Sequence, residues 1–482
     1  MKRTTVLRAA NHLGQLLVSL VLIAVGVLLL VIRDLLVLSA AYLLGAALVV
    51  IGVLGIVGWF LHQGRRWFEL LGMFLCIPFG ILIIFNTVIP MTIVVILFGL
   101  YLLVIGIIKA IDAVLLWQEE KAGFVLSAFQ CLVFLCLGVT LLIAPWDHIS
   151  TVFTILAIYL LILGGFQLIQ AIHELVPGKV RQKVSRRIRF PLPTVMEALL
   201  PFTVQCRVNR YLAREQTFDQ LKEEIPPRED GEPALEVFIH VADGGGNAIG
   251  HCDICFEGTM YAFGSYDEAA QHLGIAPGVL IVSKKEEYIP FTSGYAHTTI
   301  FGFGLRLTEE QKELVRKRLK EIMANTYRWY PPYQQALELD PKANLEDFTD
   351  YPSRLSVCTQ TKMYKFSKSK YKHYFLFTTN CAMLALDILG KMGLDVLNFN
   401  GILSPGTIYD FLETEYLNRG GLVIQRNIYR MTPKGLLTTD GDKNHYSYRK
   451  GAYRNFNLKP VINMDRWRSQ HKKEAKKNPG QS

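Results

Sequence analysis

Charged side chains are scarce in the first third of this 482-residue chain. Residues 1–178 contain 8 lysines and arginines and 7 acidic residues, whereas 43 and 34 lie in the remainder. A segment with so little charge cannot cover the surface of a water-soluble domain, and its apolar stretches reach the length of about 20 residues that crosses a bilayer. We therefore predict a membrane segment followed by a basic, soluble one.

Polar residues are also scarce inside the apolar stretches, where the main ones are Gln130, Thr140, Gln167 and Gln170. Pathways for ions and solutes are lined by polar or ionisable side chains, so this shortage argues against transport. A small-residue cleavage site after the first apolar stretch is missing too, and further apolar stretches follow. We therefore do not expect a secretory signal peptide.

Cysteine is present, but without a disulfide-like spacing. Three of the eight cysteines lie in apolar stretches, where a thiol behaves as a small hydrophobe. The other five are Cys206, Cys252, Cys255, Cys358 and Cys381. An odd number without a pairing pattern predicts reduced thiols in a cytosolic setting.

Six apolar stretches are predicted as transmembrane helices, at about 13–32, 36–60, 69–86, 90–111, 124–144 and 149–172. Two glycine series recur along them with spacings of 54 and 58 residues, namely Gly26, Gly80, Gly138 and Gly52, Gly106, Gly164. Shared spacings predict a triplicated helical hairpin in which small residues let the backbones approach. The segment 1–175 resembles the HdeD acid-resistance membrane family, a resemblance that carries no catalytic motif.

Lysine and arginine predict the orientation of these helices. Thirteen basic residues fall on one side and Arg33 alone on the other, so both termini are predicted to be cytoplasmic in an inner membrane. Six of the thirteen form the strip 179–189. This strip could contact anionic lipid headgroups, or it could serve only to anchor the topology.

The soluble part is predicted to be an α+β domain with mainly antiparallel strands. A basic linker, 176–233, precedes the domain at 234–430, and a basic tail covers 431–482. Strands are predicted at about 235–241, 249–256, 259–264, 279–283, 298–307 and 371–377. Helices are predicted at about 308–324, 381–392 and 405–417.

One cysteine stands where a nucleophile would be activated. Cys381 follows Asn380 and opens an apolar helix, where free N–H groups and the helix dipole favour a thiolate. A base is available in His251, on a predicted strand whose alternation puts Asp253 and Cys255 on the same face. Imidazole can take the thiol proton and later return it to a leaving group.

Three strings carry a second resemblance, "IGHCDICFEGTMYAFGSYD", "FGFGLRLTEEQKELVRKRL" and "YKHYFLFTTNCAMLALDIL". They resemble circularly permuted papain-like peptidases of the NlpC superfamily, particularly the Lnb-type periplasmic domain family, over residues 234–400. The resemblance implies Cys381 as nucleophile and His251 as base. The group that orients the imidazole stays open, with Asn380, Tyr261 and Asp267 as candidates.

The function predicted from this resemblance is a membrane-anchored thiol hydrolase or acyltransferase. Its substrate would be an amide or ester in a peptide, a peptidoglycan fragment or a lipid. The periplasmic location of the resembled family conflicts with the predicted cytoplasmic termini, and we follow the charge rule. Besides the lipid bilayer and this substrate, no cofactor, metal or nucleic acid is predicted as a partner.

Two alternatives belong to other classes of protein. The spacing of Cys252 and Cys255 is that of a zinc knuckle, but on a strand these residues would face opposite sides. The second alternative is a non-catalytic membrane scaffold or stress-response protein with a degenerate papain-like domain.

Overall fold

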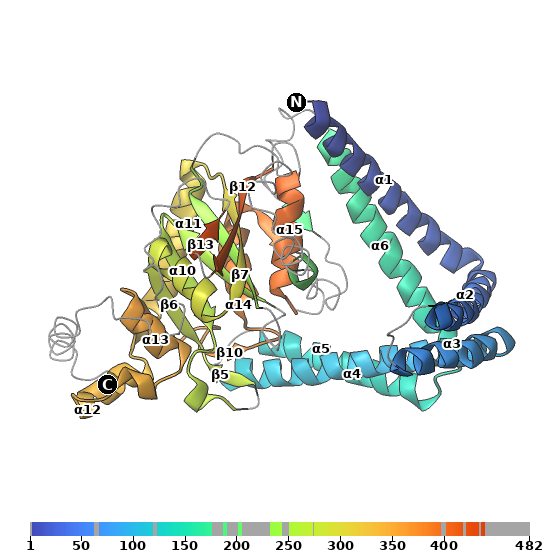
Figure 1. Cartoon of the computed structure of the whole chain (residues 1–482), viewed down its shortest axis with the longest axis horizontal. Coiled ribbons are helices and arrows are strands. Elements are labelled where there is room, and N and C mark those ends of the chain that lie inside the picture. Colours follow the sequence, from blue (N-terminus) through green and yellow to red (C-terminus); the bar gives the residue numbers. More distant parts are fainter. Residues whose placement is uncertain are drawn as a thin grey trace. The chain divides into compact units, whose positions relative to one another are not determined.

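A computed structural model describes most of the chain as two compact units (Figure 1). The described residues are 2–61, 67–118, 123–175, 187–189, 201–204, 232–242, 250–272, 274–396, 402–417, 421–432 and 435–438. One unit spans Thr5–Leu175, and the other comprises Val176–Ser482 with Met1–Thr4. Each unit is considered by itself below.

The first unit is helical throughout its described length. Its elements are α1 (Lys2–Val31), α2 (Arg33–Leu61), α3 (Trp67–Phe85), α4 (Val88–Gln118), α5 (Phe124–Ile143) and α6 (Ile149–Leu175). Within the described residues, three helices have the length and apolar composition to cross a membrane, at Leu38–Val57, Val88–Gln118 and Phe124–Ile143. The apolar parts of α1, α3 and α6 are shorter. Membrane character is thus confirmed.

Glycines mark the places where these helices cross. A Cβ added at Gly80 would lie 2.6 Å from the carbonyl oxygen of Gly45, and one added at Gly45 would lie 2.8 Å from that of Gly80. The backbones of α2 and α3 therefore touch, and neither glycine has room for a side chain. This agrees with the close packing that the glycine series predicts.

The same crossing occurs between two further helix pairs. In α4 and α5, a Cβ at Gly138 would lie 3.0 Å from the oxygen of Gly99, and in α1 and α6 a Cβ at Gly26 would lie 3.1 Å from that of Ala157. The predicted triplicated hairpin would pair the two helices within each repeat, that is the first with the second, the third with the fourth and the fifth with the sixth. The glycine crossings instead join α2 with α3, α4 with α5, and α1 with α6, because the glycine series face the neighbouring repeat.

The second unit is built on a nine-stranded, fully antiparallel sheet with the strand order β13-β12-β7-β2-β3-β4-β6-β9-β8. Its strands are β2 (Leu235–Ala242), β3 (His251–Phe256), β4 (Thr259–Gly264), β6 (Val279–Lys284), β7 (Thr298–Leu305), β8 (Thr326–Trp329), β9 (Lys362–Phe366), β12 (Val423–Thr432) and β13 (Gly435–Thr438). Two small sheets pair β5 (Ile275–Pro277) with β10 (His373–Phe375), and β1 (Arg187–Arg189) with β11 (Leu394–Val396). The predicted α+β class with antiparallel strands is confirmed.

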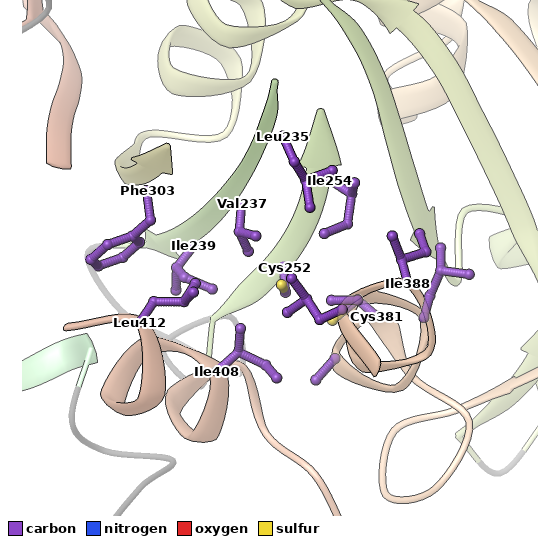
Figure 2. Close-up of a cluster of buried hydrophobic side chains, with 14 of the residues drawn as sticks. Leu235, Val237, Ile239, Cys252, Ile254, Phe303, Cys381, Ile388, Ile408 and Leu412 are labelled. Carbon is purple, nitrogen blue, oxygen red and sulfur yellow. The ribbon is translucent and has the colours of Figure 1, made fainter. Parts of the chain in front are cut away.

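Helices cover both faces of the large sheet. One face packs against α11 (Glu309–Ala324), α14 (Cys381–Leu389) and α15 (Pro405–Leu417), and Figure 2 shows part of this core. The other face packs against α10 (Lys285–Tyr295) and α13 (Tyr351–Cys358), with α12 (Pro332–Leu339) on α13. Short 3-10 turns lie at Glu268–Ala270, Leu345–Asp347 and Gly390–Met392.

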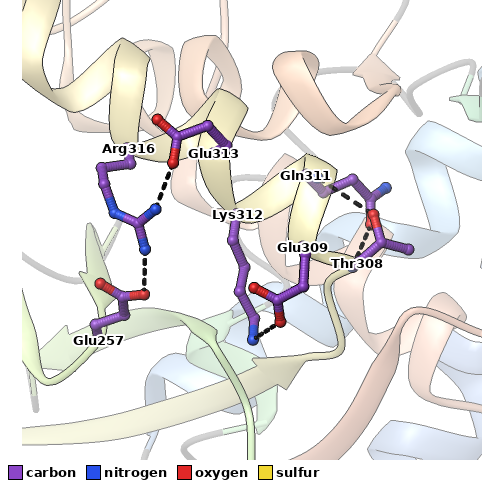
Figure 3. A network of polar contacts seen from close by, with 7 residues as sticks. All are labelled: Glu257, Thr308, Glu309, Gln311, Lys312, Glu313 and Arg316. Atoms are coloured by element: carbon purple, nitrogen blue, oxygen red, sulfur yellow. Dashed lines mark hydrogen bonds and ion pairs between the residues drawn. The ribbon is translucent and has the colours of Figure 1, made fainter.

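A two-residue turn sets the register of β3 and β4. Glu257 and Gly258 both have positive φ, at 49° and 76°, as a type I′ hairpin turn requires. Figure 3 shows how α11 holds this turn, because Arg316 lies 2.7 Å from Glu257. The start of α11 is fixed by Thr308, whose hydroxyl accepts a hydrogen bond from the Gln311 backbone in a capping box.

The segment before Cys381 differs from its prediction. A continuous strand was expected at 371–377, but only His373–Phe375 is a strand, and it pairs with β5 outside the large sheet. The backbone of Lys372 closes a turn onto Ser369, and the chain turns again after Phe375. These turns break the pairing that an apolar, aromatic sequence favours.

Several elements had no counterpart in the predicted set, namely α10, α12, α13, β8, β9, β12 and β13. Strand β12 was hidden by its polar centre, where Gln425 and Asn427 pair with Gly304 and Gly302 of β7. Pairing in the sheet continues to Thr438. The rest of the predicted tail, the glycine-rich residues 243–247 and most of the 176–233 linker lie outside the described residues.

Candidate active site

The candidate site lies where strands β3 and β4 separate. Their ladder runs from Phe256↔Thr259 to Asp253↔Ala262, and so stops one residue short of Cys252. Side chains alternate along β3, with Cys252 in the core that contains α14, and Cys255 in the core that contains α10. The backbone at the start of β3 is thereby left open to α14.

Asn380 positions the nucleophile candidate at the start of α14. Its side-chain oxygen accepts a hydrogen bond from the Met383 backbone at 3.0 Å, and its amide nitrogen donates to the carbonyls of Leu376 and Leu403 at 2.7 and 2.6 Å. An N-cap of this kind fixes the first helical turn. Cys381 is therefore the first helical residue, with a side chain only 3% exposed.

The surroundings of Cys381 favour its thiolate. Burial opposes ionisation, but the charge of His251, a hydrogen bond from His251 and another from the Cys252 backbone N–H together lower the pKa of this thiol. The Tyr374 hydroxyl also lies 4.0 Å from the sulfur. By contrast, burial raises the pKa of Cys252 and of Cys255, so these two thiols are held neutral.

A carboxylate faces His251 from the same strand. The Nε2 of His251 lies 2.8 Å from Asp253 Oδ1, and the imidazole keeps 26% of its side-chain surface exposed. The N–H direction deviates from the oxygen, so the contact is an ion pair more than an aligned hydrogen bond. Although burial lowers the pKa of His251, the charges of Asp253 and Cys381 outweigh burial and raise this pKa well above its ordinary value.

Asp253 is held by three groups. Besides His251, the imidazole of His240 lies 2.9 Å from Oδ2, and the Tyr288 hydroxyl donates to Oδ2 at 2.9 Å. Burial would raise the pKa of this carboxyl, but the charges of His251 and His240 lower it far below its usual range. Tyr266 adds a hydroxyl 3.2 Å from His251 Nε2. Asp253 is thus fully buried as an ionised group.

The structure brings together some of the predicted site residues and not others. Cys381, His251 and Asn380 meet around the start of α14. Asp267 instead forms an ion pair with Lys365 at 2.6 Å. Tyr261 packs against the core under α14 and α11, on the face opposite to Asp253.

Sequence reasoning missed the carboxylate as the group facing the imidazole. Asp253 was assigned to the face of His251, but was not named as its partner. His240 could have been found from the hairpin, since it lies directly across from His251. Tyr266 and Tyr288 gave no local signal, because they come from a loop and from α10.

Comparisons with known proteins concern the helical unit. A family model described as a short repeat of unknown function, DUF308, matches residues 17–85, 74–143 and 129–180. This repeat family covers HdeD-like membrane proteins, so residues 17–180 consist of DUF308 repeats in apolar helices. No curated protein and no solved structure matches the chain.

Proposed function

We propose that the second unit is a thiol hydrolase or acyltransferase that cleaves an amide or ester through Cys381 and His251. The observation that carries this proposal is that Cys381, the first residue of α14, meets His251, whose Nε2 lies 2.8 Å from the buried Asp253; the pKa is accordingly lowered for the thiol and raised for the imidazole. Both shifts favour the thiolate with its proton held on the imidazole, which is the form that attacks a carbonyl carbon.

The proposed chemistry uses both ring nitrogens of His251. Because Nε2 faces Asp253 and Tyr266, Nδ1 is the nitrogen left for the thiol. The thiolate adds to the carbonyl carbon, and the backbone N–H of Cys381 stabilises the oxyanion. His251 then gives its proton to the leaving amine or alcohol, which leaves an acyl group on sulfur. Water or another acceptor, deprotonated by His251, takes the acyl group and restores the thiol.

Asp253 is proposed as the group that orients His251, in place of Tyr261 or Asp267. Its negative charge stabilises the imidazolium, and its second oxygen is held by His240 and Tyr288. Asn380 is proposed to act through the helix cap and not on the substrate.

The membrane part of the proposal rests on hydropathy and charge. We infer six spans in an inner membrane, with both termini in the cytoplasm, from the apolar helices and the basic residues of the loops. The permuted papain-like fold stays a proposal that rests on the resemblance of the strings around His251 and Cys381.

The test is selective alkylation of the full-length protein in detergent. At about pH 6, where an ordinary thiol with a pKa near 8.5 is protonated, iodoacetamide should modify Cys381 ahead of the other cysteines of this unit. His251→Asn should slow that reaction, whereas His272→Asn, at an exposed position, should not. An activated ester should then leave its acyl group on Cys381. Preferential reaction of another cysteine would refute the assignment.

A second candidate is a non-catalytic membrane scaffold, and one observation favours it. Cys381 is only 3% exposed, and a cavity lined by Tyr295, His297, Thr349 and Arg354 does not include it. If the protein is a scaffold, the activated ester should leave Cys381 of the folded protein unmodified. Complete alkylation of Cys381 in denatured protein would serve as the control that the thiol itself is intact.

A further inference from the structure

A tight turn just before the nucleophile candidate presents two apolar side chains to the outside. The carbonyl of Phe375 accepts hydrogen bonds from the backbones of Thr378 and Thr379 at 3.2 and 3.0 Å, which closes the turn. Leu376 and Phe377 form its tip, and their side chains are 44% and 39% exposed. Asn380 donates to the Leu376 carbonyl, so the tip is tied to the cap of α14.

Residues of this kind are unusual at the tip of a turn. Turns favour glycine, proline, asparagine, aspartate and serine, each for a reason of backbone geometry. Phe377 lies against the buried Phe375, with ring centroids 5.5 Å apart, yet both tip residues remain exposed on a turn closed by backbone hydrogen bonds. Single exposed apolar residues are common on proteins, so the surrounding charge decides what this tip could contact.

The charged residues within the segment that contains the turn, 367–379, are all basic. Residues 367–379 include four exposed polar positions, Ser367, Lys368, Lys370 and Lys372, and no acidic residue. Lys370 lies 3.1 Å from Asp387. The three-residue strand β10 separates Lys372 from Leu376, four residue steps or at most about 13 Å at 3.3 Å per residue. Apolar residues at the tip of a turn, with cations about one headgroup layer away from that tip, are typical of a segment that contacts the membrane interface.

We propose that residues 367–379 dock on an anionic phospholipid surface, with Leu376 and Phe377 entering the interface and Lys368 and Lys372 contacting the headgroups. The chain's own membrane unit keeps such a surface in reach of the domain. Because the tip is tied to Asn380, docking places the start of α14 beside the lipid. The inference goes beyond the thiol chemistry and does not depend on it.

The experiment uses the full-length protein in nanodiscs of phosphatidylcholine alone or with phosphatidylglycerol. A photoactivatable phospholipid with its reactive group near the ester linkage is cross-linked, and the labelled residues are mapped by mass spectrometry. Label should reach Leu376 and Phe377 and rise with phosphatidylglycerol. Lys368→Gln and Lys372→Gln should each lower the labelling about five-fold, the change expected for one cation at an anionic surface.

Leu339 provides the matched control, because it is 89% exposed at the end of α12. Leu376→Ser with Phe377→Ser should abolish the label at the turn, whereas Leu339→Ser should leave it unchanged. Alkylation of Cys381 reports separately on the site, so docking can fail while the thiol proposal holds. The proposal would be overturned if labelling of the turn did not depend on phosphatidylglycerol or on either lysine. It would also be overturned if no labelling of the turn occurred in any nanodisc.

Discussion

At the scale of single residues, the candidate site depends on one buried carboxylate. Asp253 Oδ1 faces His251, while Oδ2 accepts a hydrogen bond from Tyr288 and lies 2.9 Å from the imidazole of His240. Burying a charge without such partners would cost several kcal/mol. The arrangement therefore makes Asp253 a fixed anion that stabilises the protonated form of His251.

Replacing Asp253 should weaken the thiolate. In Asp253→Asn, His251 loses the anion that raises its pKa, so we expect this pKa to fall. Cys381 then loses its imidazolium partner near neutral pH. The direct effect has the opposite sign, since Asp253 slightly raises the thiol pKa, but it is the smallest of the causes acting on Cys381.

The measurement is the pH profile of Cys381 alkylation. The profile of Asp253→Asn should move to higher pH, because the thiolate of Cys381 loses the imidazolium that stabilises it. Asp267→Asn is the control, because this carboxylate pairs with Lys365. An unchanged profile in Asp253→Asn, with intact fold, would mean that Asp253 does not govern His251.

At the scale of elements, the cap of α14 joins three pieces of chain. Asn380 binds the first turn of α14, the turn before it and the segment that precedes α15. Asn380→Ala should lower the free energy of unfolding by about 0.5–2 kcal/mol, the usual cost of losing an N-cap.

Asn344→Ala is a suitable control, because Asn344 caps only an exposed three-residue turn. Chemical denaturation with a probe in this unit would measure both variants. Asn380→Asp keeps the cap acceptor, but its second oxygen would face the Leu376 and Leu403 carbonyls, so it should not recover the stability lost in Asn380→Ala, and its negative charge should slow the alkylation of Cys381. Equal stability of wild type and Asn380→Ala would contradict this role of the cap.

The glycine crossings of the membrane unit make a second prediction at this scale. Gly80→Leu should separate α2 from α3, because the Gly45 carbonyl occupies the space of its first side-chain atom. Overpacking of this kind costs about 1–3 kcal/mol or more. Gly72→Leu lies on the same helix with nothing within 4 Å of its Cβ position, and should be tolerated. Thermal unfolding in detergent would compare the two, and equal melting temperatures would count against a backbone contact.

Local patterns predicted much of the candidate site. The helix start at Cys381 and the alternation along the strand of His251 depend on neighbouring residues, which sequence reveals. The partners of Asp253 come from β2 and α10, so tertiary packing decides them. The prediction of a continuous strand at 371–377 was wrong for a related reason. Backbone turns at Ser369 and Phe375 override the β propensity of the aromatic residues.

At the scale of the whole molecule, the chain joins a membrane unit of DUF308 repeats to an α+β unit. The proposed orientation can be tested without any assumption about catalysis. Cysteine substitutions at Arg33 and Arg65 should differ in their reaction with a membrane-impermeant maleimide added outside intact cells, because the charge rule puts these loops on opposite sides. Arg33→Cys should react and Arg65→Cys should not. The reverse result would place the α+β unit outside the membrane.

The crossing of α1 with α6 has a consequence for how the chain is made. Helix α1 ends at Val31 and α6 begins at Ile149, so about 118 residues are synthesised between them. At roughly 5–20 residues per second, a ribosome needs about 6–24 seconds for this stretch. Helices α2 and α4 meet their partners as soon as the next helix emerges, whereas α1 waits for the last one. Of these six helices, α1 is therefore the one that depends longest on the insertion machinery.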